Sequence, residues 1–299
     1  MSYHNPVLLK ESVDGLVVDT NGTYVDVTFG GGGHSKEILK RLDQGKLIAF
    51  DQDTDALANK LDDDRFVLVN DNFRSLSRRL DECEAIPVDG LLADLGVSSH
   101  QFDEPSRGFS IRFDSDLDMR MNQDSELTAK YILNYYEEED LIRLFKEYGE
   151  LHNAWKIAKA IVKARSQKEI TSSDEFKSII KACALRGKEN SFYAQVYQAL
   201  RIEVNDEMKA LSELLSQVPE ILKKGGRMVV ISYHSLEDRM VKNLINTGNI
   251  QGILEKDIYG NVLGLKFKSM HKKTIEPSGE EVQQNSRARS AKMRIAERI

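Results

Sequence analysis

Four consecutive glycines, Gly30–Gly33, follow a short β-branched and aromatic run at 24–28, and they constrain this chain more than any other feature. Apolar residues with helical spacing, Ile38, Leu39 and Leu42, come next. A strand, a glycine turn and a helix in this order let the backbone pass close to a nucleotide-like ligand, because glycine has no side chain to hold the ligand away. The segment therefore predicts a ligand-binding turn at one edge of a parallel sheet.

The residues after this turn exclude its two familiar pyrophosphate-binding forms. A P-loop requires Lys and then Ser or Thr after the last glycine, whereas Gly33 is followed by His34 and Ser35. A dinucleotide fingerprint counted from Gly30 requires glycine where Ser35 stands. Asp26, near the end of the preceding strand, is the acidic residue that remains. We infer a cofactor that has a nucleoside but no phosphate.

The order of elements predicts an α/β fold with a helical insertion. Short apolar runs separated by helical patterns indicate a parallel sheet whose two faces are both buried. From about 125 to 200 the chain shows helical periods and no convincing strand, and we expect an inserted helical domain at 116–202 between sheet segments 1–115 and 203–299. The expected strands are 24–28, 47–50, 66–69, 88–93, 227–232, 262–267 and 292–296, and a polar loop is expected at 272–285.

The bulk composition limits the functional classes. The chain has 299 residues, of which 40% are hydrophobic and 30% charged, as in an ordinary globular protein. Its net charge of −6 means that any nucleic-acid surface must be a local patch. No signal pattern opens the chain, no apolar run approaches the roughly 20 residues that span a bilayer, and two isolated cysteines read as reduced thiols. We therefore expect a cytoplasmic protein that has no membrane partner.

Polar and aromatic residues follow three of the expected strands. Asp51 ends the second strand about 20 residues after the glycine turn, where nucleoside-binding α/β proteins place a carboxylate for the ribose hydroxyls. Phe73 follows the third strand, where an aromatic ring can cover an adenine face. Asp94 ends the fourth strand and precedes a loop with Ser98 and Ser99. Because parallel strands end at one sheet edge, these residues indicate a site there.

Further candidates carry basic groups. His234 comes just after the fifth strand, at the same expected edge of the sheet. Arg107, and the C-terminal pair Arg287 and Arg289, are suited to contact phosphates or to pair with acids. A lysine stripe at 156, 159 and 163 reads as a solvated helix face. The six histidines lack ligand spacing, so no metal site is expected.

A glycine turn alone is weak evidence, but eight motifs run in order along nearly the whole chain. They are His4-x-Pro6-Val7-Leu8-Leu9-x-Glu11, Asp26-x-Thr28-x-Gly30-x-Gly32-Gly33-His34-Ser35, Leu91-x-Ala93-Asp94-Leu95-Gly96-Val97-Ser98-Ser99, Arg107-Gly108-Phe109-Ser110, Leu117-Asp118-Met119-Arg120-Met121, Gln198-Ala199-Leu200-Arg201-Ile202-x-Val204-Asn205, Ser235-Leu236-Glu237-Asp238-Arg239 and Asn285-x-Arg287-Ala288-Arg289-Ser290. Taken together, these motifs resemble those of the MraW family, also called RsmH, of bacterial 16S rRNA cytosine-N4 methyltransferases that use S-adenosylmethionine.

The resemblance implies a class I methyltransferase fold, with a mainly parallel seven-stranded sheet and an inserted all-helical substrate-recognition domain. It implies a cytidine of the decoding region (P site) in 16S rRNA as the substrate, and the small ribosomal subunit as the partner. We expect Asp94 to accept from the target amine, with His234 as a second catalytic candidate, and Ser98 and Ser99 to hold the cytosine. Oligomeric state is left open, a homodimer included. The cofactor contacts of the family fall on Gly32, Gly33, His34, Asp51, Phe73, Asp94 and Gln101.

Three other functions remain as alternatives. An amino-methyltransferase acting on DNA cytosine or adenine would carry Asp/Asn-Pro-Pro-Tyr/Phe, but Asp94-Leu95-Gly96-Val97 occupies that place. A nicotinamide-dependent oxidoreductase is disfavoured by Ser35. A non-catalytic RNA-binding protein on the same fold is disfavoured because Gly32-Gly33-His34, Asp51 and Asp94 are all intact.

Overall fold

The computed structural model describes residues 6–299, so His4 of the first motif lies outside the described part. The chain forms two compact units. A sheet unit comprises the chain up to Gly96 together with Met208–Ile299, and a helical unit comprises Val97–Glu207. The helical unit contains the whole of the expected insertion at 116–202.

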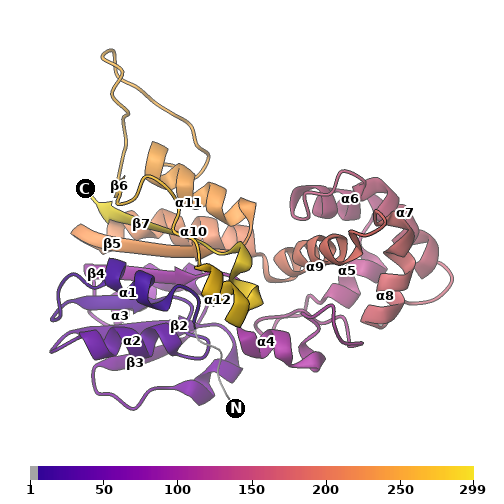
Figure 1. Cartoon of the computed structure of the whole chain (residues 1–299), viewed down its shortest axis with the longest axis horizontal. Coiled ribbons are helices and arrows are strands. Elements are labelled where there is room, and N and C mark those ends of the chain that lie inside the picture. Colours follow the sequence, from indigo (N-terminus) through magenta and orange to yellow (C-terminus); the bar gives the residue numbers. More distant parts are fainter. Residues whose placement is uncertain (1–5) are drawn as a thin grey trace. The chain divides into compact units, whose positions relative to one another are not determined.

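The sheet unit has seven strands in the order β3-β2-β1-β4-β5-β7-β6 (Figure 1). The five strands β1 to β5 pair in parallel, whereas β7 runs antiparallel to both of its neighbours. The expected mainly parallel, seven-stranded sheet is therefore confirmed. The strands are β1 Thr23–Asp26, β2 Lys46–Asp51, β3 Phe66–Asn70, β4 Val88–Asp94, β5 Leu222–Ser232, β6 Phe267–Ser269 and β7 Lys292–Arg298.

Successive residues of the central strands pack on opposite faces of the sheet. In β4, Leu91 belongs to one buried cluster and Leu92 to the other. One face is covered by α1 and α2, and the other by α3, α10 and α11. This double burial explains why the strands are continuous apolar runs. The helices of this unit are α1 Leu9–Leu16, α2 Gly33–Arg41, α3 Leu76–Glu82, α10 Glu207–Ile221, α11 Ser235–Thr247 and α12 Gly279–Gln284, with short 3-10 segments η1 Thr54–Asn59, η2 Phe73–Ser75 and η5 Ser286–Ser290.

Two expectations near the C-terminus are wrong. The sixth strand is not 262–267 but Phe267–Ser269. Gly260 and Gly264 have positive φ values of 87° and 71°, and this turns the chain between α11 and β6 away from the sheet (Figure 1). The expected loop at 272–285 contains α12, because Ser278 accepts a hydrogen bond from the Glu281 amide at 3.1 Å and caps a new helix.

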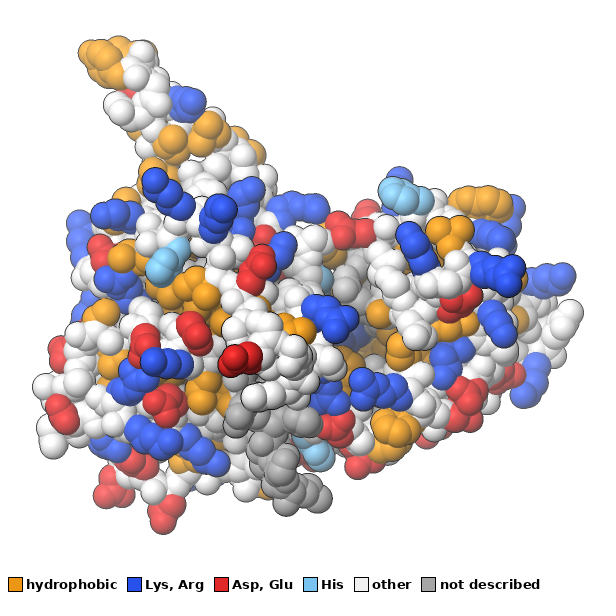
Figure 2. Space-filling view, viewed as in Figure 1, with side chains coloured by type: hydrophobic (Ala, Val, Ile, Leu, Met, Phe, Trp, Pro, Cys, Tyr) orange, Lys and Arg blue, Asp and Glu red, His pale blue; other side chains and the backbone are white. Residues whose placement is uncertain are grey.

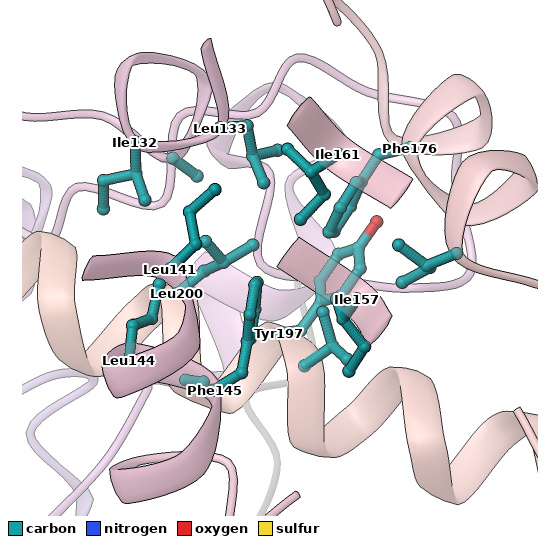
Figure 3. Close-up of a cluster of buried hydrophobic side chains, with 14 of the residues drawn as sticks. Ile132, Leu133, Leu141, Leu144, Phe145, Ile157, Ile161, Phe176, Tyr197 and Leu200 are labelled. Carbon is teal, nitrogen blue, oxygen red and sulfur yellow. The ribbon is translucent and has the colours of Figure 1, made fainter. Parts of the chain in front are cut away.

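The helical unit has a core of its own, with no contribution from the sheet (Figure 3). Leu141 and Phe145 from α6 meet Ile157 from α7 and Leu200 from α9, and all four are fully buried. No helix within the described residues combines the length and apolar character needed to cross a bilayer. The elements are α4 Ser99–Asp103, η3 Pro105–Arg107, α5 Ala129–Tyr135, α6 Glu138–Glu147, α7 Ala154–Arg165, α8 Ser173–Ile180, η4 Lys181–Cys183 and α9 Glu189–Asn205.

The helical unit begins at Val97, well before residue 116. The reason is that the irregular segment before α5 packs on the helical core through Phe109 and Leu117. Asn205, the last residue of α9, fastens this segment: its side chain accepts from the Met121 amide at 2.7 Å and donates to the Met119 carbonyl at 2.8 Å. The segment is thus part of the same folding unit as the helices.

Two glycines of the helical unit allow the cost of a steric clash to be separated from the cost of backbone strain. Gly108 and Gly187 have φ values of 74° and 79°, but a Cβ on Gly108 would lie 2.4 Å from the Asp116 carbonyl oxygen, whereas Gly187 has open space. We expect Gly187→Ala to lower the free energy of unfolding by ~1–2 kcal/mol, and Gly108→Ala by roughly 2–5 kcal/mol, because overpacking adds to strain. Urea denaturation measures both, and equal losses would contradict the clash.

Candidate active site

The carboxyl ends of four neighbouring strands form one polar edge of the sheet. The strand order reverses between β1 and β4, and ligands of open α/β sheets bind at such a switch point. The last residues of β2, β1 and β4 are Asp51, Asp26 and Asp94, and β5 ends at Ser232. Three carboxylates are thus gathered where a ligand of this fold is expected.

Asp26 is the structural centre of this edge. It is 1% exposed, and the Ser35 hydroxyl at the start of α2 donates to its carboxylate at 2.7 Å. The Thr28 amide donates to the same group at 3.1 Å. The Thr28 hydroxyl in turn accepts from the Asp94 amide at 2.7 Å. Asp26 therefore ties β1, the start of α2 and the end of β4 together.

The glycine turn is attached to the end of β2. Asp51 accepts from the Gly30 amide at 2.7 Å and from the Asp53 amide at 2.9 Å. Gly32 has a φ of 74°, and a Cβ on Gly33 would lie 2.2 Å from Pro6 Cγ, so both positions require glycine. Burial raises the pKa of the Asp51 carboxyl to about 6, although both amide contacts oppose that rise.

These residues fit a nucleoside cofactor. A carboxylate has about four lone-pair positions, and the two amides use only some of those on Asp51, which leaves acceptor capacity for ribose hydroxyls. Phe73 opens η2 three residues after the end of β3, where it is half-buried against the core and keeps part of its surface exposed. The turn offers backbone groups and no cation for a pyrophosphate. The assignment of Gly32, Gly33, Asp51 and Phe73 to the cofactor stays a prediction.

Asp94 has the surroundings of a reactive carboxylate. The Tyr233 hydroxyl donates to its Oδ1 at 2.8 Å, and its Oδ2 lies 3.8 Å from His34 Nδ1. Its side chain keeps 22% of its surface exposed, which gives a ligand access. Desolvation raises the pKa of Asp94 to about 6, and His34 and Tyr233 oppose the rise.

His34 is fixed from its other side. Its Nε2 lies 3.2 Å from the Val7 carbonyl oxygen, and because a carbonyl only accepts, this contact assigns a hydrogen to Nε2. The ring is 5% exposed and joins the start of α2 to the segment before α1. His34 therefore faces Asp94 with Nδ1, in a position set by the backbone of the chain itself.

Tyr233 is a site residue that the sequence did not single out. Burial and the neighbouring Asp94 raise its pKa well above the usual value, so the phenol stays protonated and acts as a donor. Glu237, in the first turn of α11, accepts from the Tyr233 amide at 2.8 Å and holds this backbone in place. The one available signal was its position directly after the end of a buried strand, beside His234.

His234 occupies the N-cap position of α11. Its Nε2 lies 3.0 Å from Glu237 Oε1, and its side chain is 6% exposed. The backbone amide of His234 also contacts Glu237, at 3.3 Å. These contacts favour a role at the start of the helix over direct contact with a substrate.

Four predicted residues, Ser98, Ser99, Gln101 and Arg107, lie in the helical unit, and all but Ser99 have hydrogen bonds there that fix their side chains. Ser98 caps α4 by accepting from the Gln101 amide at 3.2 Å, and the Gln101 side chain accepts from the Ser98 amide at 3.0 Å. Arg107 is 6% exposed and donates to the carbonyls of Arg120 and Met121 at 2.9 and 3.0 Å. This placement favours a structural role for Arg107 over the expected phosphate contact.

The C-terminal arginines lie in η5 of the sheet unit. Ala288 between them is buried, and Arg289 is exposed, whereas Arg287 is half-buried. The Asn285 side chain accepts from the Arg287 amide at 3.2 Å and fixes the start of this turn. Arg289 remains suited to a phosphate contact, which the structure leaves as a prediction.

The strand order, the antiparallel β7 and the nucleoside-type turn after β1 together define a class I methyltransferase. A model of the MraW methylase family matches residues 1–299, and the chain belongs to this family. The family resemblance, the fold class and the cofactor S-adenosylmethionine, all expected from the sequence, are thereby confirmed.

Curated relatives cover the chain from end to end. They bear the name Ribosomal RNA small subunit methyltransferase H. The protein of Christiangramia forsetii is 58% identical over 300 residues, covering 100% of this chain and 99% of that protein. Those of Flavobacterium johnsoniae and Bacteroides thetaiotaomicron are 57% and 55% identical, each covering 100% of this chain and 99% and 98% of theirs.

The raised pKa of Asp51 makes a prediction about stability. A carboxyl whose pKa is higher in the folded state stabilises the fold below its unfolded pKa, and this contribution is lost as pH rises through the folded value. The unfolding free energy of the cofactor-free wild type, relative to Asp51→Asn, is therefore expected to fall by on the order of 3 kcal/mol between pH 4 and 7.

Asp63→Asn is the matched control for urea titrations at each pH. Arg65 lowers the pKa of Asp63 to about 2, so its contribution is lost only as pH falls through that value and stays constant from pH 4 to 7. A flat or rising difference for Asp51→Asn would contradict the assigned shift.

Proposed function

We propose that this chain transfers a methyl group from S-adenosylmethionine to the exocyclic N4 amine of a decoding-region (P-site) cytidine in 16S rRNA of the small ribosomal subunit. The full-length relatives named as small-subunit rRNA methyltransferases support the substrate class. The Asp94 carboxylate, partly exposed at the switch point and hydrogen-bonded to Tyr233, is the observation that carries the amine chemistry. Such a substrate places the protein in the cytoplasm.

The reaction requires the protein to supply a hydrogen-bond acceptor for the amine. The lone pair of the cytosine amine is delocalised into the ring, so the nitrogen is a poor nucleophile. An acceptor within roughly 2.6–3.2 Å of an amine hydrogen favours a nitrogen whose lone pair is available. S-adenosylmethionine, when bound, supplies an activated methyl group on a sulfonium. The remaining task of the protein is to align and orient the amine.

Asp94 and Tyr233 divide this task. Because the phenol of Tyr233 stays protonated and donates to Oδ1, it orients the carboxylate and leaves lone pairs of Oδ2 to accept from the amine. With a pKa of about 6, Asp94 is ionised at neutral pH yet is a stronger acceptor than an ordinary aspartate. The target base must leave its stack to reach such a group. We also propose that Ser98 and Ser99 contact the cytosine, and that Arg287 and Arg289 contact phosphates.

The proposed activity is tested with labelled S-adenosylmethionine and three substrates: small ribosomal subunits, protein-free 16S rRNA and DNA. Nucleoside analysis then identifies the labelled base. We expect label in N4-methylcytidine of rRNA and none in DNA. Asp94→Ala is expected to lower kcat by 100-fold or more, within the range of about 10²–10⁴ for general acid–base groups. Cofactor binding by the variant is the control. Normal turnover of Asp94→Ala would remove the acceptor role, and label in DNA alone would overturn the substrate.

Tyr233→Phe tests the orientation of the carboxylate through pH. Asp94 must be ionised to accept, so activity is expected to rise as pH increases through about 6. The Tyr233 hydrogen bond lowers the pKa of Asp94, and its removal therefore shifts the acid limb of kcat to higher pH.

Tyr24→Phe is the matched control for this variant. Tyr24 is also buried, and its hydroxyl donates to the Asp19 carbonyl at 2.9 Å, at the opposite end of β1. We expect Tyr24→Phe to lose stability without moving the acid limb. The same limb in Tyr233→Phe and the wild type would contradict the assigned role.

A further inference from the structure

The exposed side of α7 combines an aromatic platform with a basic stripe. Trp155 is 56% exposed, although large aromatic side chains are usually buried. Lys159 lies one turn on, with its Nζ 5.6 Å from the centre of the Trp155 ring, and Lys163 continues the stripe. The buried side chains of the helix, from Ala154 to Ile161, lie on the opposite side. This exposed side therefore contributes nothing to the core.

A neighbouring segment extends the same surface. The Lys156 ammonium donates to the Ala182 carbonyl at 2.9 Å, and the Asn153 side chain donates to the Cys183 carbonyl at 2.8 Å. These bonds hold the segment 181–188 beside α7. We call the two together the α7 face, whose exposed basic side chains are Lys156, Lys159, Lys163, Lys181, Arg186 and Lys188.

The charge of the α7 face is opposite to that of the chain. Neither α7 nor the segment 181–188 contains an acidic residue, whereas the whole chain has a net charge of −6. The adjoining acid, Glu189, accepts from the Gly187 amide at 3.0 Å and is thus engaged locally. Figure 2 shows Lys and Arg side chains lying among hydrophobic ones over the helical unit. A local basic patch on an acidic protein is what a phosphate backbone selects.

We infer that the α7 face binds single-stranded or looped rRNA, with an unstacked base on Trp155 and the neighbouring lysines on phosphates. This inference rests on the proposed rRNA substrate and names a surface that contacts it. Aromatic rings stack on any base, and a cation beside the ring adds attraction, so this contact adds affinity without base specificity. A protein partner would have to present acidic groups around an apolar pocket. Besides Trp155, this face offers such a pocket only one large exposed apolar side chain, Leu185, which is 71% exposed.

Trp155 is the only tryptophan of the chain, so fluorescence excited at wavelengths that only tryptophan absorbs reports on this face alone. Titration of the wild type with protein-free 16S rRNA is expected to give saturable quenching whose apparent Kd rises steeply with salt. Anisotropy of dye-labelled rRNA then compares the variants. Trp155→Ala is expected to bind about 5- to 150-fold more weakly, the range for one stacked base, and Trp155→Phe to bind nearly as the wild type does.

The lysines are tested through salt dependence. The double variant K159Q/K163Q is expected to reduce the slope of log Kd against log salt by about 1.4–1.8, since each phosphate contact contributes about 0.7–0.9. Lys40→Gln removes an exposed lysine from the last turn of α2 in the other unit, and its slope is expected to equal that of the wild type.

The outcomes separate this inference from the proposed function. If the wild type neither binds nor methylates rRNA, both are wrong. Suppose that the wild type methylates rRNA, but RNA leaves its Trp155 fluorescence unchanged, and K159Q/K163Q and Trp155→Ala bind RNA as the wild type does. Then only the inference is wrong. If the fluorescence changes with whole small subunits and a photocrosslink from position 155 then joins a ribosomal protein instead of rRNA, the partner is a protein and the inference is also overturned.

Discussion

The sheet unit depends on one buried carboxylate, Asp26. A charge at this depth is costly unless hydrogen bonds compensate it, and the donors are the first turn of α2 and the turn after β1. Thr28 extends this network to β4, because its hydroxyl accepts a hydrogen bond from the Asp94 amide. The glycine turn and Asp94, the proposed reactive carboxylate at the end of β4, are therefore positioned by a single network. Ser35, the residue that excluded a dinucleotide fingerprint, is one of its donors.

Sequence reasoning succeeded where strand ends determine position. Asp51 and Asp94 were recognisable because each closes an apolar run, and a parallel sheet brings such ends to one edge. The structure indeed places both at the ends of β2 and β4. The glycine turn was equally recognisable from the sequence, because positive φ at Gly32 and the lack of space at Gly33 allow no other residue. These features follow from local pattern and topology alone.

What the sequence did not reveal depends on contacts made only after folding. Tyr233 looks like any residue that follows a strand until its hydroxyl meets Asp94. Arg107 was expected at phosphates because of its charge, and Gln101 at the cofactor only because of the family resemblance. Neither ground shows whether such a group faces a ligand or its own backbone. The sixth strand was misplaced because apolar residues at 262–265 suggested pairing, whereas of the expected strand only Phe267 belongs to β6.

Asp26, Asp51 and Asp94 lie at neighbouring strand ends, and burial raises the pKa of each. The methyl donor of this family carries a positive sulfonium that its demethylated product lacks. Donor and product thus differ by one charge in a region where the protein has gathered negative groups. At this proposed cofactor site, the affinity for the cofactor therefore depends on how many protons these carboxyls carry, and cofactor binding changes that number in turn. As the proposed cofactor site, this cluster would attract the positively charged donor more strongly than the neutral product, and this difference favours release of the product.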